Sequence, residues 1–294
     1  MKTSIRFFND REVRAVWDDS QSIWWYSILD IVGVINDQDD YTKNRNYWKY
    51  LKRKLTLEDN ELVSYTNQLK LTASDGKKYL TDVIPEGYVV NLISLFPNSK
   101  GMRFAEWFLG GADSDDSRSK AKAYTLFDSS LLESIEVGTI KGLQQIHGFL
   151  FGGIFEFAGQ IREINIAKGG FQFAMAQYLP ETLHNIEKMP ENSLDEILDK
   201  YIEMNVAHPF REGNGRATRI WLDLMLKNNL KLCIDWSKVG KYEYLKAMEI
   251  SVADDKPIKQ LLKSALTDKI NNREVFMKGI DYSYYYEDDI SQIF

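Results

Sequence analysis

The sequence predicts a mainly α-helical protein in which a helical core carries a β-hairpin flap and follows a small α+β N-terminal domain. Three observations support this fold class. Apolar residues recur at three- and four-residue spacing over most of the chain after residue 125, as in amphipathic helices. One stretch of that part, residues 161–175, alternates apolar and polar residues instead. The first 112 residues mix strand and helix patterns.

The composition is that of an ordinary globular protein, with 44% hydrophobic and 27% charged residues among 294. The single cysteine, Cys233, excludes an intrachain disulfide framework and a multi-cysteine metal site. The three histidines, His147, His184 and His208, are too dispersed to predict a local metal cluster. Charges interrupt the N-terminal residues, and no apolar run is long enough to cross a membrane. We therefore expect a cytoplasmic protein without a membrane partner.

A small, polar segment at residues 110–123 predicts the domain boundary. It contains no aromatic residue, whereas both of its flanks are aromatic and apolar. We expect a small α+β module at residues 1–112, a linker at 113–124, a helical core at 125–270 and a C-terminal segment at 271–294.

In the N-terminal module, short apolar runs between turn residues predict strands, or a strand leading into a helix, at 5–8, 13–17 and 21–28. A further strand is predicted at 77–83, and helices at 44–55, 85–96 and 100–109.

In the second part, helical spacing predicts helices at 126–135, 139–151, 179–188, 193–207, 215–227, 241–251 and 257–267. Residues 161–175 predict a hairpin with Gly169-Gly170 at its centre. A hairpin attached to a helical protein often contacts partners.

The most informative segment covers residues 208–219, which read HPFREGNGRATR. Pro209 prevents simple continuation of the preceding helix, and the Gly213–Gly215 turn permits positive φ. Consecutive N–H groups at the start of the following helix favour an anion. Arg216 and Arg219 are three residues apart and so share a helix face. This arrangement predicts a polyphosphate site.

Two side chains beside this turn add to its chemistry. Glu212 can hold a divalent cation that bridges phosphate oxygens. His208 titrates near neutrality and can take a proton from an attacking hydroxyl. The alternative is that the turn only connects two helices and that His208 is a packed core histidine. The fixed order of so many specified residue types argues against chance agreement.

This segment resembles the signature of the Fic family, His-x-Phe-x-Asp/Glu-Gly-Asn-Gly-Arg-x-x-Arg, and every specified position is matched. The resemblance covers residues 125–270 and includes Gly152–Arg162, which is similar to the family segment that leads into a substrate-docking flap. It implies an all-α core that transfers AMP from ATP to a protein hydroxyl and releases pyrophosphate.

The resemblance also implies roles for individual residues. His208 matches the general base that deprotonates a Tyr, Ser or Thr of the target protein, and Glu212 matches the ligand of Mg²⁺. Arg216 matches the ligand of the β-phosphate, and Arg219 that of the γ-phosphate. The nest around the α- and β-phosphates is matched by Gly213, Asn214 and Gly215.

Two further regions match parts of the family site. The hairpin matches the flap, which clamps the target by strand addition; its expected docking residues are Ile164, Asn165, Ile166, Gly169, Gly170, Phe171 and Phe173. The helix at 242–251 resembles the one that lines the nucleotide base, where we expect Tyr244 and Ser251. For these two residues, a core tyrosine and a helix-surface serine are the alternative. Some relatives transfer phosphocholine or phosphate. The complete motif favours the transfer of AMP, but the sequence does not exclude another nucleotide as substrate.

In the C-terminal segment, Ser283 and Glu287 are one helical turn apart. They resemble the inhibitory motif Ser/Thr-x-x-x-Glu-Gly/Asn of the C-terminally autoinhibited Fic subclass, with Asp288 at the last position. The resemblance implies that Glu287 pairs with Arg219 and blocks the γ-phosphate. A solvated acidic and aromatic tail is the alternative. Self-modification at Tyr284–Tyr286 would be one way to release the inhibition.

The N-terminal module has a basic and aromatic stretch at residues 41–54 that contains no acidic residue. Such a stretch can follow a phosphate backbone, although a solvated helix face is the alternative. The module loosely resembles the Bro-N domain of phage and viral antirepressors, which implies contact with DNA. Residues 1–112 contain equal numbers of basic and acidic residues, which argues against tight non-specific DNA binding.

Two classes of function therefore compete. The first is an autoinhibited enzyme that places AMP on a protein hydroxyl, including its own. The second is a DNA- or partner-binding regulator with a silent Fic core. The complete motif favours the enzyme, because a silent core would be expected to have lost His208 or one of the arginines.

Overall fold

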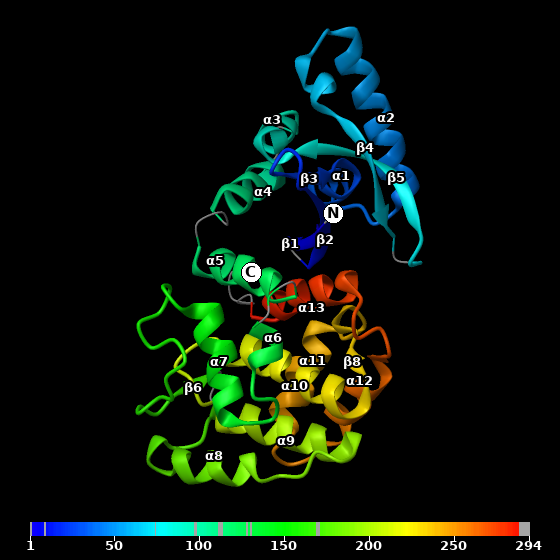
Figure 1. Cartoon of the computed structure of the whole chain (residues 1–294). Helices are drawn as coiled ribbons and strands as arrows, with labels where there is room; N and C mark the ends of the chain where they lie inside the picture. Colours follow the sequence, from blue (N-terminus) through cyan, green and yellow to red (C-terminus); the bar gives the residue numbers. More distant parts are fainter. Residues whose placement is uncertain are drawn as a thin grey trace. The chain divides into compact units, whose positions relative to one another are not determined.

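The computed structural model of the chain describes residues 2–8, 10–73, 75–96, 99–110, 114–127, 129, 131–168 and 171–287. The chain divides into two compact units between Ser114 and Asp115, and each unit has its own buried core (Figure 1). The fold class predicted from the sequence is confirmed, since helices dominate and the largest sheet belongs to the first unit.

The first unit is built on a five-stranded sheet in the order β1-β2-β3-β5-β4, in which every neighbouring pair is antiparallel. Its strands are β1 (Lys2–Phe8), β2 (Arg11–Asp18), β3 (Ile23–Ser27), β4 (Asn67–Thr72) and β5 (Lys78–Pro85). Its helices are α1 (Ile28–Asn36), α2 (Tyr41–Leu57), α3 (Val89–Ile93) and α4 (Ser99–Gly110).

Helix α2 is joined to the sheet by a buried tryptophan and a shared carboxylate. Trp48 is 3% exposed and donates from Nε1 to Asp82 Oδ2 at 2.7 Å, and Lys52 binds the same oxygen at 2.9 Å. The sequence pattern did not predict β4, because most of its residues are exposed or half-buried and lack the apolar alternation of a core strand. The helix expected at 85–96 contains only the short α3, preceded by a 3₁₀ turn at Glu86–Tyr88.

The second unit is helical with two short sheets. Its helices are α5 (Asp115–Leu126), α6 (Leu131–Ser134), α7 (Ile140–Phe151), α8 (Leu179–Glu187), α9 (Leu194–Ala207), α10 (Asn214–Leu230), α11 (Lys241–Ile250), α12 (Lys256–Ser264) and α13 (Arg273–Tyr285). Its strands pair as β6 (Ala167–Lys168) with β7 (Phe171–Gln172) and as β8 (Cys233–Ile234) with β9 (Leu266–Thr267).

Helix α10 forms the centre of the second unit (Figure 1). Ala217, Trp221, Leu222 and Met225 are fully buried, and the helix packs against α7, α9 and α13. A helix that is buried on nearly all sides is held rigidly by its neighbours. The first turn of α10 therefore provides a fixed platform for the loop that precedes it. Among the described residues, no helix combines the length and apolar character needed to cross a membrane.

Three elements of the second unit differ from the sequence-based expectation. Residues 113–124, expected as a linker, are mostly part of α5, whose Ala123 is buried in the core of this unit. The helix expected at 126–135 is divided, since α5 ends at Leu126 and α6 begins at Leu131. The hairpin expected over 161–175 is paired only at β6 and β7, and Gly169 and Gly170 lie outside the described residues.

Candidate active site

The loop between α9 and α10 begins and ends in left-handed backbone conformations. His208 ends α9 with φ of 50°, and its N–H donates to the carbonyl of Met204 at 3.0 Å. Gly213 begins α10 with φ of 77°. Asn214 closes the loop, because its Oδ1 accepts from the N–H of Phe210 at 2.8 Å and its Nδ2 donates to the Phe210 carbonyl at 2.7 Å. The loop is therefore held in one shape by its own residues.

A second histidine supports this loop from α7. The N–H of Gly159 donates to Nδ1 of His147 at 2.9 Å, so the proton of the neutral ring is on Nε2, which lies 2.9 Å from the carbonyl of Glu212. The His147 ring stacks on Phe210 with centroids 3.8 Å apart. Burial lowers the pKa of His147 to about 4, so the ring is neutral at physiological pH. The sequence did not predict this role of His147, although its place in an apolar helix was a signal.

The imidazole of His208 is oriented by a contact of Nδ1 with the main chain. Its Nδ1 lies 3.2 Å from the carbonyl of Asn205. A carbonyl oxygen only accepts, so Nδ1 carries the proton and Nε2 carries the lone pair. The ring of Phe173 stacks on that of His208 at 3.7 Å and 14°. His208 is half-buried, and this tautomer is the one that a general base requires.

Arg216 is buried between two carboxylates and two aromatic rings. Its Nη1 binds Asp116, and its Nη2 donates to Glu212 Oε1 at 2.9 Å. The guanidinium lies 5.0 Å from the ring centroid of Phe151 and 5.3 Å from that of Tyr284. Its Nε is buried and has no acceptor among the described residues. An unmatched buried donor beside a glycine turn fits a further anionic oxygen from a ligand.

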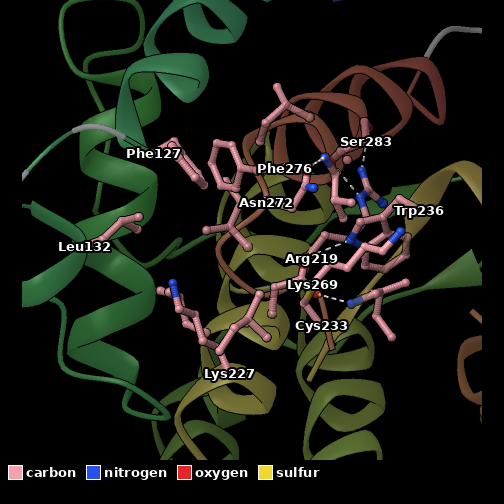
Figure 2. Close-up of a pocket in the computed structure, with 18 residues that line it drawn as sticks. Phe127, Leu132, Arg219, Lys227, Cys233, Trp236, Lys269, Asn272, Phe276 and Ser283 are labelled. Atoms are coloured by element: carbon pink, nitrogen blue, oxygen red, sulfur yellow. Dashed lines mark hydrogen bonds between the residues drawn. The ribbon is translucent and has the colours of Figure 1, made fainter. Parts of the chain in front are cut away.

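Arg219 is 2% exposed and is held by the C-terminal helix. It donates from Nε to the hydroxyl of Ser283 at 2.8 Å and from Nη2 to the Ser283 carbonyl at 2.7 Å (Figure 2). Its Nη2 also donates to Glu287 Oε1 at 2.5 Å. Its guanidinium also lies over the rings of Tyr244 and Tyr286, at 5.6 and 5.2 Å from their centroids. The partners of this arginine are thus mostly residues of α13 and the turn that follows it.

The carboxylate of Glu287 also lies directly against the glycine turn. A Cβ atom placed on Gly215 would be 2.2 Å from Glu287 Oε1 and 3.0 Å from both terminal nitrogens of Arg219. The first turn of a helix together with a guanidinium is a favourable position for an anion. In this structure a carboxylate of the same chain takes that position.

The two residues expected from α11, Tyr244 and Ser251, are placed differently. The hydroxyl of Tyr244 lies 2.5 Å from that of Tyr201 and 3.4 Å from Nη1 of Arg219, so the structure brings it to this arginine. Ser251 is buried at the end of α11 and donates to the carbonyl of Met248 at 2.7 Å, a bond within its own helix turn.

The expected flap residues are placed as follows. Ile164 is 49% exposed, Asn165 Oδ1 accepts from the N–H of Ala176 at 2.8 Å, and the carbonyl of Ile166 accepts from the N–H of Phe173 at 3.3 Å. Phe171 is in β7, and nothing is described of its side chain. Phe173 is therefore the flap residue that the structure brings to His208.

A cavity of about 70 Å³ lies on the other side of Arg219 in the second unit, where α10, α13 and β8 contribute to its wall. Figure 2 shows Arg219 and Ser283 in its wall, together with apolar side chains such as Phe276. Of the described residues that line it, none belongs to 208–216. The cavity is therefore separate from the glycine turn and from the imidazole.

Comparisons with known proteins include a family match within the second unit. Residues 138–226 match the model of the Fic/DOC family. The chain is 31% identical to the protein adenylyltransferase VbhT of Bartonella schoenbuchensis over 147 residues, which are 45% of this chain and 30% of that protein. It is 28% identical to a probable protein adenylyltransferase Fic of Escherichia coli over 156 residues, which are 48% of this chain and 78% of that protein.

Among solved structures, the BepC protein of Bartonella tribocorum with bound AMPPNP is similar, with a TM-score of 0.47 and 20% identity. That similarity covers 54% of this chain and 87% of that one.

Proposed function

We propose that this protein is a protein adenylyltransferase that moves AMP from ATP to a Tyr, Ser or Thr hydroxyl of a target protein, and the match of residues 138–226 to the Fic/DOC family model supports the proposal. One observation supports this most. The N-terminal turn of α10 and the buried Arg216 and Arg219 form a binding site for anions. The imidazole of His208, with its lone pair on Nε2, lies at the end of the preceding helix.

The proposed reaction is a single displacement at the α-phosphorus. The hydroxyl oxygen of the target attacks and forms the new phosphoester bond, while its proton passes to Nε2 of His208. The bond from the α-phosphorus to the oxygen that bridges to the β-phosphate breaks, and pyrophosphate leaves with that electron pair. The protein contributes position, charge neutralisation and one proton acceptor.

The phosphates would be held by the turn and the arginines. The N–H groups of Gly213–Gly215 would face the α- and β-phosphates, with Arg216 at the β-phosphate and Arg219 at the γ-phosphate. The unmatched Nε of Arg216 supports this assignment, because a phosphate oxygen would provide its acceptor. The nearby Tyr244, which lies at Arg219, would contact the nucleotide from α11, whereas the intrahelical bond of Ser251 gives it no such support.

The residues present also fit Mg²⁺. The carboxylate of Glu212 is 57% exposed and lies at the start of α10 beside Arg216. Among the residues that the structure describes, no three His, Cys, Asp or Glu side chains gather to hold a metal. Mg²⁺ commonly uses one or two carboxylates and completes its coordination with substrate phosphates and water. When bound, it would neutralise phosphate charge.

The target would dock on the flap at residues 164–173. A strand of the target would add to the short β6–β7 pair through main-chain hydrogen bonds. The stacking of Phe173 on His208 supports this, because it joins the docking segment to the base. The same chain could serve as target, but Tyr284 and Tyr286 are 7% and 1% exposed, so α13 would first have to detach.

We also propose that Glu287 restrains the enzyme. Its carboxylate binds Arg219 at 2.5 Å and lies against Gly215, where a nucleotide phosphate would otherwise be held. Ser283 fastens the same arginine through two hydrogen bonds, which keeps α13 and Glu287 in place. A charge-assisted hydrogen bond to a buried guanidinium is strong enough to compete with a phosphate.

The decisive experiment uses ATP labelled on the α-phosphate, Mg²⁺ and a cell lysate as target source, with variants E287G and H208A/E287G. We expect label on protein with E287G and none with the double variant, together with release of pyrophosphate. Label from γ-labelled ATP, or from GTP or CTP in preference to ATP, would assign the transfer of another group. Absence of label with E287G under all of these conditions would reject the enzyme.

The exposed face of α2 favours a second candidate function, contact of the first unit with DNA. Tyr50 is 72% exposed, and the basic residues around it that are also exposed are Lys43, Arg45, Lys49, Arg53 and Lys54. Aromatic side chains among cations can stack on bases and follow a phosphate backbone. A salt-dependent shift of a DNA fragment by the full chain, lost in K49E/R53E, would support this function.

A further inference from the structure

Arg162 is a buried cation that binds only backbone carbonyls among the described residues. It is 2% exposed, and its pKa is lowered by burial. The guanidinium donates to His208 O at 2.7 Å, Ile164 O at 2.6 Å, Ala174 O at 2.5 Å and Ala207 O at 3.1 Å. A buried charge without a carboxylate partner is costly, so its retention calls for a specific role.

The four carbonyls come from two places in the sequence. Ala207 and His208 end α9, where His208 takes its left-handed conformation. Ile164 and Ala174 stand at the two ends of the flap, on either side of β6 and β7. One guanidinium therefore holds both ends of the flap and the backbone of the histidine.

Two backbone hydrogen bonds join the same two segments. The N–H of Arg162 donates to the carbonyl of Pro209 at 2.9 Å, and the N–H of Ala174 donates to that of Val206 at 3.3 Å. The stacked ring of Phe173 lies one residue before Ala174. The flap base and the end of α9 thus form one connected unit around Arg162.

Lysine could not make this set of contacts. The guanidinium presents five N–H groups in a planar fork and can serve several carbonyls in one plane, whereas an ammonium group is a single point with three donors. A lysine would keep the charge and lose the geometry. The two effects can therefore be separated by a conservative substitution.

We propose that Arg162 is a positioning residue for AMP transfer. It fixes the position of the flap relative to the backbone of His208, so that the hydroxyl of a docked target lies at Nε2. The proposal rests on the proposed function. It assigns Arg162 no contact with the substrate or the nucleotide. Near-attack geometry is worth orders of magnitude in rate, so a small loss of position should be measurable.

The test compares E287G with R162K/E287G, with R211K/E287G as the matched control. Arg211 is exposed, lies in the same loop and has its described contact with the ring of Phe157. For R162K we expect kcat to fall about tenfold or more and the KM for the target to rise. The KM for ATP should stay within about twofold, because Arg162 binds none of residues 212–219 among its described partners. The control should match E287G in all three.

Histidine-selective NMR adds a readout that does not depend on activity. The chain has three histidines, so a ring spectrum can be assigned with H208A. In R162K the His208 ring signals should move, while those of His147 and His184 stay in place. Unchanged His208 signals together with unchanged kcat and target KM would overturn the proposal. If E287G itself transfers nothing, the proposed function fails, and the NMR result still decides the role of Arg162.

Hydrogen exchange on the unsubstituted chain covers the case in which R162K does not fold. The amides of Arg162 and Ala174 should exchange through one common opening, with the same denaturant dependence, because one side chain joins the segments that contain them. Independent opening of the two amides would also overturn the proposal.

Discussion

The carboxylate of Glu287 accepts a hydrogen bond from Nη2 of Arg219 at 2.5 Å, and these two residues are 68 positions apart in the chain. The pair brings the end of α13 to the first turns of α10. Arg219 is 2% exposed, so its charge is neutralised by this carboxylate and not by solvent. Any polyphosphate that uses this arginine must displace Glu287.

Removing this carboxylate should therefore activate the protein. We expect E287G to raise AMP transfer or self-modification severalfold over the parent with ATP in excess, because Arg219 becomes available to the γ-phosphate. The initial rate with labelled ATP measures this. The matched control is E249G, which removes an exposed carboxylate of α11. Equal rates for E287G and the parent would reject the inhibitory role.

A methyl group on the glycine turn should behave differently from loss of Glu287. In G215A the new Cβ would lie 2.2 Å from Glu287 Oε1, so the carboxylate has to move. The same methyl group would occupy the space where a phosphate approaches the turn. We expect G215A to lower the melting temperature and to leave transfer undetectable, even when it is combined with E287G. Transfer by G215A/E287G at the rate of E287G would show that no phosphate lies against this residue.

Asp116 should oppose nucleotide binding at the other arginine. It binds Nη1 of Arg216, which would have to turn toward the β-phosphate. In the E287G background, we expect D116N to tighten MgATP binding about threefold to tenfold, measured by calorimetry. The control is D115N, whose carboxylate pairs with the exposed Arg118 of the same helix. An affinity that is unchanged or weaker in D116N would mean that Asp116 does not compete with the nucleotide.

His147 should make stability depend on pH in a defined direction. Burial lowers its pKa from 6.5 to about 4, so between these values the unfolded chain binds more protons than the folded one. The free energy of unfolding should rise with pH over this window, by at most about 3 kcal/mol. Denaturant unfolding at several pH values for the parent and H147Q measures it. The variant should be less stable at pH 7 and should lack this part of the slope; an identical slope would place the effect elsewhere.

The helices of the second unit were largely predictable from local patterns. Helix α9 begins after Ser193, whose hydroxyl and the carboxylate of Glu196 form a capping box, and both signals are legible in the sequence. Helix α10 was predicted from its apolar spacing and the preceding glycines. By contrast, α13 was not predicted as a helix, because its polar and aromatic residues are buried by contacts from α5 and α10 that no local pattern contains.

Contacts over long sequence distances account for what was missed at the site. His147 lies 65 residues from Glu212, whose carbonyl it approaches, and Asp116 lies 100 residues from Arg216. Arg162 was read only as the end of a segment that leads into the flap. Its four carbonyl partners become visible when α9 and the flap are packed together.

The sequence by itself determined the chemistry of residues 208–219. Glycine, proline and helical periodicity act over a few residues, so the order of residue types was enough to predict a tight turn, a helix start and two arginines on one face. The resemblance of the C-terminal segment had also implied the pairing of Glu287 with Arg219, and the structure brings these two side chains together. Only the tertiary structure decided the other contacts of the two arginines. Ser283 and Asp116 reach them through the packing of α13 and α5, and packing depends on the shape of the whole core rather than on spacing along the chain.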